Sequence, residues 1–124
     1  MGQYSFRKEE RLSKEKDIQE LFEKGSSFYL YPFKIILRHN PDQTYQFHQV
    51  LISVPARNFK RAVDRNLLKR RIREAYRLNK ALLKESKKLM IAYIYTPKEI
   101  LTFDQLQEKL IKAFKRFDQH VGKN

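Results

Sequence analysis

Residues 61–78 read RAVDRNLLKRRIREAYRL and form the most informative segment of the chain. A helix over this segment, at about 100° per residue, gathers Leu68, Ile72 and Ala75 into one apolar sector. Tyr76 lies on the boundary of that sector. The adjoining sector is almost purely cationic and holds Arg65, Asn66, Lys69, Arg70, Arg73 and Arg77. The segment therefore predicts a helix that buries a narrow stripe against a sheet and presents a row of cations outward.

The cations around this helix are unusually concentrated. Between Arg57 and Arg77 there are nine cations and two anions, so this stretch contributes +7 of the chain's formal net charge of +13. A solvated helix face normally mixes both signs, and like charges four residues apart destabilise a helix. Seven of the nine cations are arginine, whose planar guanidinium matches phosphate oxygens and stacks on bases. A polyanionic partner is predicted, with nucleic acid first and an anionic membrane surface second.

Length and composition exclude several other classes of protein. A chain of 124 residues with 41% hydrophobic residues suits a single domain over 1–124 with a real core. It has no cysteine, which excludes disulfides, thiolate metal sites and cysteine nucleophiles. The histidines at 39, 48 and 120 lack metal-ligand spacing, so no metal site is predicted. Without a membrane-length apolar run or a signal-peptide core, a cytoplasmic location is expected.

The first quarter of the chain predicts a tail followed by one helix. Residues 1–11 are polar and of mixed charge, which predicts a loose tail. A helix is expected to begin with Ser13 as its N-cap and to end at Gly25. Its apolar residues Ile18, Leu21 and Phe22 share one face, which either joins the core or meets a ligand.

Two strand predictions follow this helix. Residues 28–39 alternate so that Phe33, Ile35 and Leu37 face a core, and there is room for an additional strand within the stretch. The opposite face carries Lys34, Ile36 and Arg38, which leaves Ile36 as an apolar residue between two cations. Residues 44–54 predict a second strand, and the turn signal at 40–42 favours an antiparallel hairpin between the two.

The remaining segments complete the element order. Residues 79–88 predict a short helix or an irregular link, and residues 89–95 (LMIAYIY) predict a central, buried strand. Residues 103–121 repeat apolar residues at steps of three and four, which predicts an amphipathic C-terminal helix. The order α-β-β(-β)-α-β-α predicts an α+β fold, a small two-layer α/β sandwich.

Residues 62–77 closely resemble the signature helix of the bacterial ribonuclease P protein family, A-V-x-R-N-R-x-K-R-x-x-R-E-A-[FY]. Its matching positions are Arg65, Asn66, Lys69, Arg70, Arg73 and Glu74. Two flanking motifs agree with the family pattern: Arg11-Leu12 with Phe22 and Gly25, and Ser53-Val54 followed by Arg57. The resemblance spans about residues 11–115. The chain departs from the pattern at three positions, where Leu67 and Ala56 replace cations and Ile18 replaces an aromatic residue.

The resemblance implies a fold and an activity. The fold would contain a left-handed βαβ crossover. The protein would be the subunit of a ribonucleoprotein endoribonuclease whose catalytic RNA, with Mg²⁺ held mainly by the RNA, removes the 5′ leader of precursor tRNA and leaves a 5′ phosphate. The partners would be the catalytic RNA subunit and precursor tRNA, with no role for DNA or membrane. No catalytic residue is expected in the protein, because no nucleophile–base pair or cluster of carboxylates is present.

The resemblance also assigns two sets of contacting residues. Those expected to bind the catalytic RNA are Arg57, Lys60, Arg61, Arg65, Asn66, Lys69, Arg70, Arg73 and Arg77. A cleft between the first helix and the sheet would hold the single-stranded leader, because single strands bind basic grooves with apolar platforms for base stacking. The residues expected there are Ile18, Phe22, Lys34, Ile36 and Arg38.

Three other functions remain as alternatives. A non-enzymatic RNA-binding module would share the basic helix but would not need the leader cleft. A DNA-binding regulator would use residues 64–77 as a recognition helix and would usually dimerise. A membrane-surface helix is the weakest alternative, because its small apolar face is shared with the core.

Overall fold

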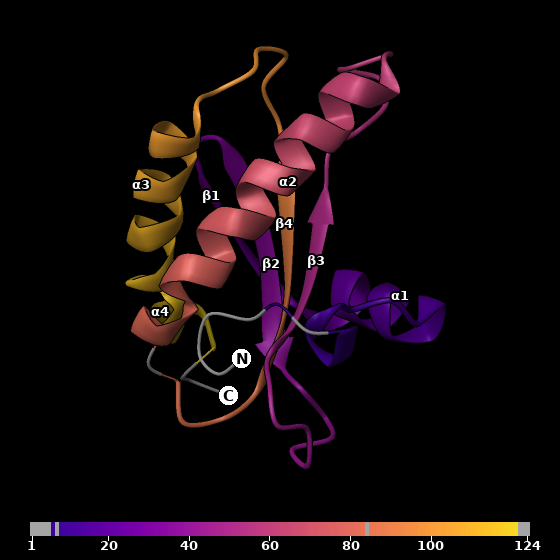
Figure 1. The fold of residues 1–124 in the computed structure, drawn as a ribbon. Coiled ribbons are helices and arrows are strands. Elements are labelled where there is room, and N and C mark those ends of the chain that lie inside the picture. The colour runs from indigo at the N-terminus through magenta and orange to yellow at the C-terminus, as the bar shows by residue number, and fades with distance from the viewer. Residues whose placement is uncertain (1–5, 7, 84, 122–124) are drawn as a thin grey trace.

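The computed structural model describes residue 6, residues 8–83 and residues 85–121, with only the backbone for 118 and 121. Its helices and strands follow the predicted order, with two strands in place of the first long one and two helices, Phe103–Phe114 and Phe117–Val121, in place of the single helix predicted over 103–121 (Figure 1). They are the short 3₁₀ helix η2 (Lys8–Glu10), α1 (Glu15–Lys24), β1 (Ser26–Leu30), β2 (Phe33–His39), β3 (Gln49–Ser53), α2 (Ala62–Asn79), the 3₁₀ helix η3 (Lys80–Leu82), β4 (Leu89–Tyr95), α3 (Phe103–Phe114) and α4 (Phe117–Val121).

The four strands form one mixed sheet in the order β1-β2-β4-β3. Strand β4 runs antiparallel to β2 and parallel to β3. The predicted antiparallel hairpin between the second and third strands is therefore wrong. The reason is that β4 is buried along almost its whole length and occupies the interior of the sheet between them. Residues 40–48 connect β2 to β3 and pass the N-terminal end of β4, where the Gln43 side chain donates to the Lys88 carbonyl at 3.0 Å.

The crossover from β3 through α2 to β4 is left-handed, as the resemblance implies. In Figure 1, α2 lies in front of the sheet, β3 runs upward, and β4 lies to the left of β3. Parallel strands joined by a helix are right-handed in nearly all proteins, so this connection is a distinguishing feature of the fold. It sets α2 diagonally across the sheet and leaves one long side of the helix facing away from it.

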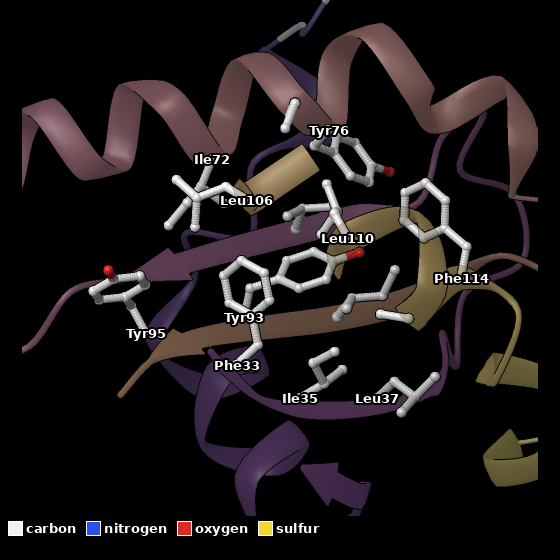
Figure 2. Close-up of a cluster of buried hydrophobic side chains, with 14 of the residues drawn as sticks. Phe33, Ile35, Leu37, Ile72, Tyr76, Tyr93, Tyr95, Leu106, Leu110 and Phe114 are labelled. Atoms are coloured by element: carbon white, nitrogen blue, oxygen red, sulfur yellow. The ribbon is translucent and has the colours of Figure 1, made fainter. Parts of the chain in front are cut away.

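The larger core lies between the sheet and helices α2, α3 and α4. Figure 2 shows side chains of β2 and β4 meeting those of α2 and α3. Phe33, Ile35 and Leu37 point into this core as the alternation predicts, and each is fully buried. Helix α3 begins with a capping box between Thr102 and Gln105, which satisfies backbone donors at the helix start.

A smaller core lies on the opposite face of the sheet, beneath α1. It consists of Leu12, Leu21, Ile36, Met90 and Ala92, with Ile18, Leu51 and Ile94 packed against it. The helix begins at Glu15 after Lys14, and no side chain caps it, so the prediction of Ser13 as N-cap is wrong. Glu15 and Asp17 in the first turn provide negative charge at the helix N-terminus instead.

Gly25 ends α1 as predicted, but for a different physical reason. Its φ is −76°, which any residue adopts, so no left-handed conformation is required. A Cβ atom at this position would lie 2.6 Å from the Leu21 carbonyl oxygen and 2.8 Å from the Ile36 Cγ2 atom. Glycine therefore permits the close approach of the helix end to β2.

The described part of residues 1–11 packs on the domain, in contrast to the predicted loose tail. The Phe6 ring meets the Tyr76 ring edge-on with centroids 5.9 Å apart. The Leu12 amide donates to the Val50 carbonyl at 2.9 Å, next to an isolated parallel bridge between Arg11 and Val50. The segment thus runs along the outer edge of β3.

Candidate nucleic-acid interface

Helix α2 divides into a buried stripe and a basic surface. Its buried residues are Leu68, Ile72, Ala75 and Tyr76, which confirms the predicted apolar sector. Tyr76 lies fully inside the core, and burial raises the pKa of its hydroxyl well above the ordinary value. Because the core covers the apolar stripe, the side of the helix that faces a partner is the side that carries the cations, with Val63 and Leu78 exposed near its two ends.

Three of the arginines are already engaged within the protein. The Nη1 atom of Arg65 donates to the Phe59 carbonyl at 2.6 Å and to the Lys60 carbonyl at 3.0 Å. The Nη1 atom of Arg71 donates to the Leu101 carbonyl at 2.7 Å, tying α2 to the segment before α3. These hydrogen bonds fix the loop before α2 and the loop before α3. Residue type and spacing in the sequence do not predict this role.

Arg77 forms the third internal contact, with Glu74 one turn earlier. The Arg77 Nε atom donates to the Glu74 carboxylate at 3.0 Å. This hydrogen bond lowers the pKa of Glu74 and raises the pKa of Arg77. Both side chains remain substantially exposed, so the pair orients the guanidinium at the surface and adds little to stability.

Lys69 and Arg73 face the N-terminal segment across a hollow of about 260 Å³. Arg11 stands on the opposite rim, with its guanidinium carbon 5.7 Å from the centroid of the Phe6 ring. The floor is mostly apolar; it includes Phe6, Leu12, Val50, Leu51 and Ile52. The hollow thus combines three cations with surfaces on which a base or sugar can rest. Arg11 is not among the residues predicted from the sequence to contact RNA, although Arg11-Leu12 belongs to the first flanking motif that resembles the family.

The remaining predicted RNA-contacting residues lie at or near the start of α2. Arg57 and Lys60 are exposed in the loop that follows β3, and Arg61 is the exposed N-cap of the helix. Asn66 and Arg70 are exposed on the first half of α2. The basic surface therefore includes exposed cations of this loop as well as those of the helix.

The predicted leader residues lie on the face of the sheet that carries α1. Lys34 is exposed, and Phe22 is 47% exposed, so the ring of Phe22 lies at the surface and outside the core. Ile18 is half-buried against the smaller core. Ile36 is only 6% exposed because α1 covers it, so it supports the helix from below and offers no open platform.

Arg38 joins α1 to the sheet. Its guanidinium lies 3.9 Å from the Glu20 carboxylate. The buried Nη1 atom of Arg38 has no hydrogen-bond partner among the described residues. Arg38 thus lies against α1, and its Nη1 group can still donate a hydrogen bond.

The described part of the chain has neither a cluster of metal ligands nor a helix that could span a membrane. Residues 6, 8–83 and 85–121 contain no group of three or more His, Cys, Asp or Glu side chains arranged to share a metal ion. No helix in this part of the chain is both long enough and apolar enough to cross a membrane.

Comparison with known proteins identifies the family. The sequence model of the family described as Ribonuclease P matches residues 6–118. The chain belongs to the ribonuclease P protein family. As a member, it is the protein subunit of a ribonucleoprotein endoribonuclease that acts in tRNA processing, and RNA is its partner. In this family the protein alone is not the catalyst.

Individual family members agree in sequence over almost their whole length. The ribonuclease P protein component of Dictyoglomus turgidum is 36% identical over 120 residues, covering 94% of this chain and 95% of the relative. That of Porphyromonas gingivalis strain W83 is 32% identical over 123 residues, covering 95% and 90%.

Solved structures of the family share the fold. The ribonuclease P protein from Thermotoga maritima superimposes with a TM-score of 0.72 at 30% identity, covering 86% of this chain and 96% of that one. The protein from Staphylococcus aureus gives a TM-score of 0.69 at 27% identity, covering 86% and 93%. The α+β fold and the family assignment predicted from the sequence are thereby confirmed.

Proposed function

We propose that the basic surface of α2 binds the catalytic RNA of ribonuclease P, and that the sheet face beside α1 binds the 5′ leader of precursor tRNA. The observation that carries the first assignment is the division of α2. Its apolar stripe is wholly buried in the core, while Lys69, Arg73 and Arg11 surround an open hollow. Phosphate contacts by such cations supply most of the affinity of a protein for nucleic acid.

The residues proposed to contact the catalytic RNA are those of the basic surface. Arg65 has a double role, because its guanidinium also holds the loop before α2. Arg77 is oriented by Glu74. The full set is Arg57, Lys60, Arg61, Arg65, Asn66, Lys69, Arg70, Arg73 and Arg77, to which we add Arg11 because it lines the same hollow as Lys69 and Arg73.

The proposed leader path follows the edge of α1. Phe22 supplies an exposed ring, Lys34 an exposed cation, and Ile18 an apolar flank. Arg38 contributes charge at the base of the helix, and Ile36 acts indirectly by supporting α1. Basic groups beside apolar platforms are the features by which proteins hold single strands.

The chemistry is proposed to belong to the RNA, which would hold the Mg²⁺ used for phosphodiester hydrolysis. The protein would act in the cytoplasm, where precursor tRNA is processed in bacteria, and would bind neither DNA nor membrane as part of this function.

The test is leader cleavage from precursor tRNA at low Mg²⁺ concentration by the catalytic RNA of the same organism, with and without this protein. We expect strong stimulation by the protein and no cleavage by the protein alone. Salt-sensitive RNA binding without stimulation would instead support a generic RNA-binding module.

Variants distinguish the two surfaces in the same assay. Lys69→Ala is expected to weaken binding of the catalytic RNA, and Phe22→Ala to weaken binding of precursor tRNA by the assembled enzyme. Lys112→Ala removes an exposed positive charge from α3 and serves as the matched control for Lys69→Ala.

A further inference from the structure

We propose that Tyr29 is a base-stacking residue for the leader of precursor tRNA, on the part of the sheet that α1 leaves open. The proposal rests on the proposed leader-binding function of this face and adds a contact that neither the signature motif nor the predicted leader residues include. It assigns to β1 a role in holding substrate.

The strand register places Tyr29 in the first row of residues beyond α1. Tyr29 pairs with Lys34, Lys34 pairs with Ile94, and Ile94 pairs with Ser53. The neighbouring row contains Ile36 and Ala92, both buried beneath α1. In the open row, Lys34 is exposed and Tyr29 is 53% exposed.

The ring of Tyr29 is held across the sheet. Its hydroxyl makes a hydrogen bond with the Thr96 hydroxyl at 3.0 Å, just beyond the end of β4. Strand β2 separates β1 from β4, so the side chain extends over β2 to reach Thr96. Thr96 is itself fixed, because its amide donates to the Pro32 carbonyl at 3.0 Å. A ring held in this way loses little conformational freedom when a base stacks on it.

The surroundings of Tyr29 suit a nucleic acid strand. Lys34 lies beside it in the pairing register. The side-chain amide of Asn58 donates to the Thr96 carbonyl at 3.3 Å. This contact brings the loop that carries Arg57 and Lys60 to the same end of the sheet. An exposed aromatic ring among cations is the arrangement on which single-stranded bases stack.

Two other aromatic residues of the described chain are strongly exposed, and they differ from Tyr29. Tyr31 donates its hydroxyl to the Glu99 carboxylate at 2.7 Å, which raises the pKa of Tyr31 to about 12. A carboxylate at that ring disfavours an approaching phosphate strand. Phe22 lies on α1 and already belongs to the proposed leader path. Tyr29 therefore supplies the aromatic surface that the buried, aliphatic Ile36 does not.

The experiment measures binding of precursor tRNA to the enzyme reconstituted from this protein and its catalytic RNA. Substrates carry either a long leader or a single leader nucleotide. Tyr29→Ala and Tyr29→Leu are expected to weaken binding of the long-leader substrate by about 5- to 100-fold, and binding of the short one far less. Tyr29→Phe keeps the ring and is expected to retain most of the affinity.

Matched variants separate this subsite from the wider proposal. Tyr31→Ala removes a comparably exposed ring nearby and is expected to leave leader binding unchanged, and urea denaturation confirms that each variant folds. Long-leader affinity that is unchanged in Tyr29→Ala, while Phe22→Ala and Lys34→Ala reduce it, would overturn the Tyr29 assignment alone. Equal weakening by Tyr29→Phe and Tyr29→Ala would also overturn it, because the hydroxyl would then account for the whole effect and the ring alone would contribute nothing. If leader length and all of these variants have no effect, the proposed leader-binding function itself fails.

Discussion

Single cations of α2 differ in what they already bind, and this difference separates their roles. Arg65 is hydrogen-bonded to the Phe59 and Lys60 carbonyls, whereas Lys69 lines the open hollow beside Arg73. Arg65 therefore stabilises the loop before α2 as well as presenting charge. Lys69 contributes charge at the surface of the hollow.

Arg65→Ala is expected to lower the free energy of unfolding by about 1–3 kcal/mol, because two backbone carbonyls lose a charged donor. Lys69→Ala is expected to change it by less than about 0.5 kcal/mol. Both should reduce the slope of log affinity for the catalytic RNA against log salt by about one. Urea denaturation and a salt titration measure the two effects. Equal stability of the two variants would show that the Arg65 hydrogen bonds contribute nothing.

His48 makes stability depend on pH. Its Nδ1 atom accepts a hydrogen bond from the Leu89 amide at 2.9 Å. Burial, with a smaller effect of Lys88, lowers the pKa of His48 from 6.5 to about 4. Between these pH values the unfolded chain binds a proton that the folded protein does not. Stability from this group is therefore complete above pH 6.5 and is lost as the pH falls towards 4.

The expected loss by pH 5 is about 1–2 kcal/mol in the free energy of unfolding. His48→Gln keeps an acceptor for the Leu89 amide but does not titrate, so the same decrease in pH should cost that variant less. Urea denaturation at neutral pH and at pH 5 makes the comparison. Identical pH dependence in both proteins would contradict the assignment.

At the scale of elements, the junction between α1 and β1 controls the leader-binding face. Helix α1 is attached to the sheet through a small core, and its C-terminal end approaches β2 at Gly25. An added methyl group there would meet the Leu21 carbonyl, which is part of the backbone, and the Ile36 side chain, which is buried. The position of α1, and of Phe22 on it, therefore depends on this glycine.

Gly25→Ala is expected to lower the free energy of unfolding by about 1–3 kcal/mol, since the overpacked helix end must shift. Leader binding should fall with it, while binding of the catalytic RNA by α2 should remain. Ser27→Ala, at an exposed position of β1, is the control. Normal stability and normal leader binding in Gly25→Ala would show that the helix end adjusts without consequence.

At the scale of the whole molecule, a buried ion pair attaches the N-terminal segment to the end of α2. The Lys80 ammonium lies 2.8 Å from the Glu10 carboxylate, with side-chain exposures of 12% and 1%. The segment so anchored carries Phe6 and Arg11, which line the hollow facing Lys69 and Arg73. The contact thus joins two segments that lie 70 residues apart in the sequence and completes one side of the basic surface.

Glu10→Gln is expected to lower the free energy of unfolding by roughly 3 kcal/mol, because it leaves the Lys80 charge in a buried site. The double variant Glu10→Gln with Lys80→Met should recover part of that loss. Affinity for the catalytic RNA should fall in the single variant as the rim of the hollow loosens. Urea denaturation and RNA titration measure both effects, and unaltered stability of Glu10→Gln would exclude an anchoring role for the pair.

Much of the candidate site was predictable because it depends on local periodicity. The buried stripe of α2 and its cationic side follow from residue spacing within one helix. The alternation of β2 likewise separates Phe33, Ile35 and Leu37 from Lys34, Ile36 and Arg38. The signature residues of α2 further identified the family and, through it, the left-handed crossover.

Other features arose only from packing between distant segments. The prediction of a central, buried strand over 89–95 is confirmed. Local patterns do not state which strands become its neighbours, so its placement between β2 and β3 was not predicted. Nor do they state which element covers a face, so Ile36 was expected to be open and is buried under α1. Tyr29 was not predicted to share a face with Lys34, because the turn before β2 shifts the alternation of side chains between the two faces of the sheet. The sheet register places the two residues beside each other. Periodicity along one element determines which side chains share a face, whereas burial across the whole chain determines what lies against that face.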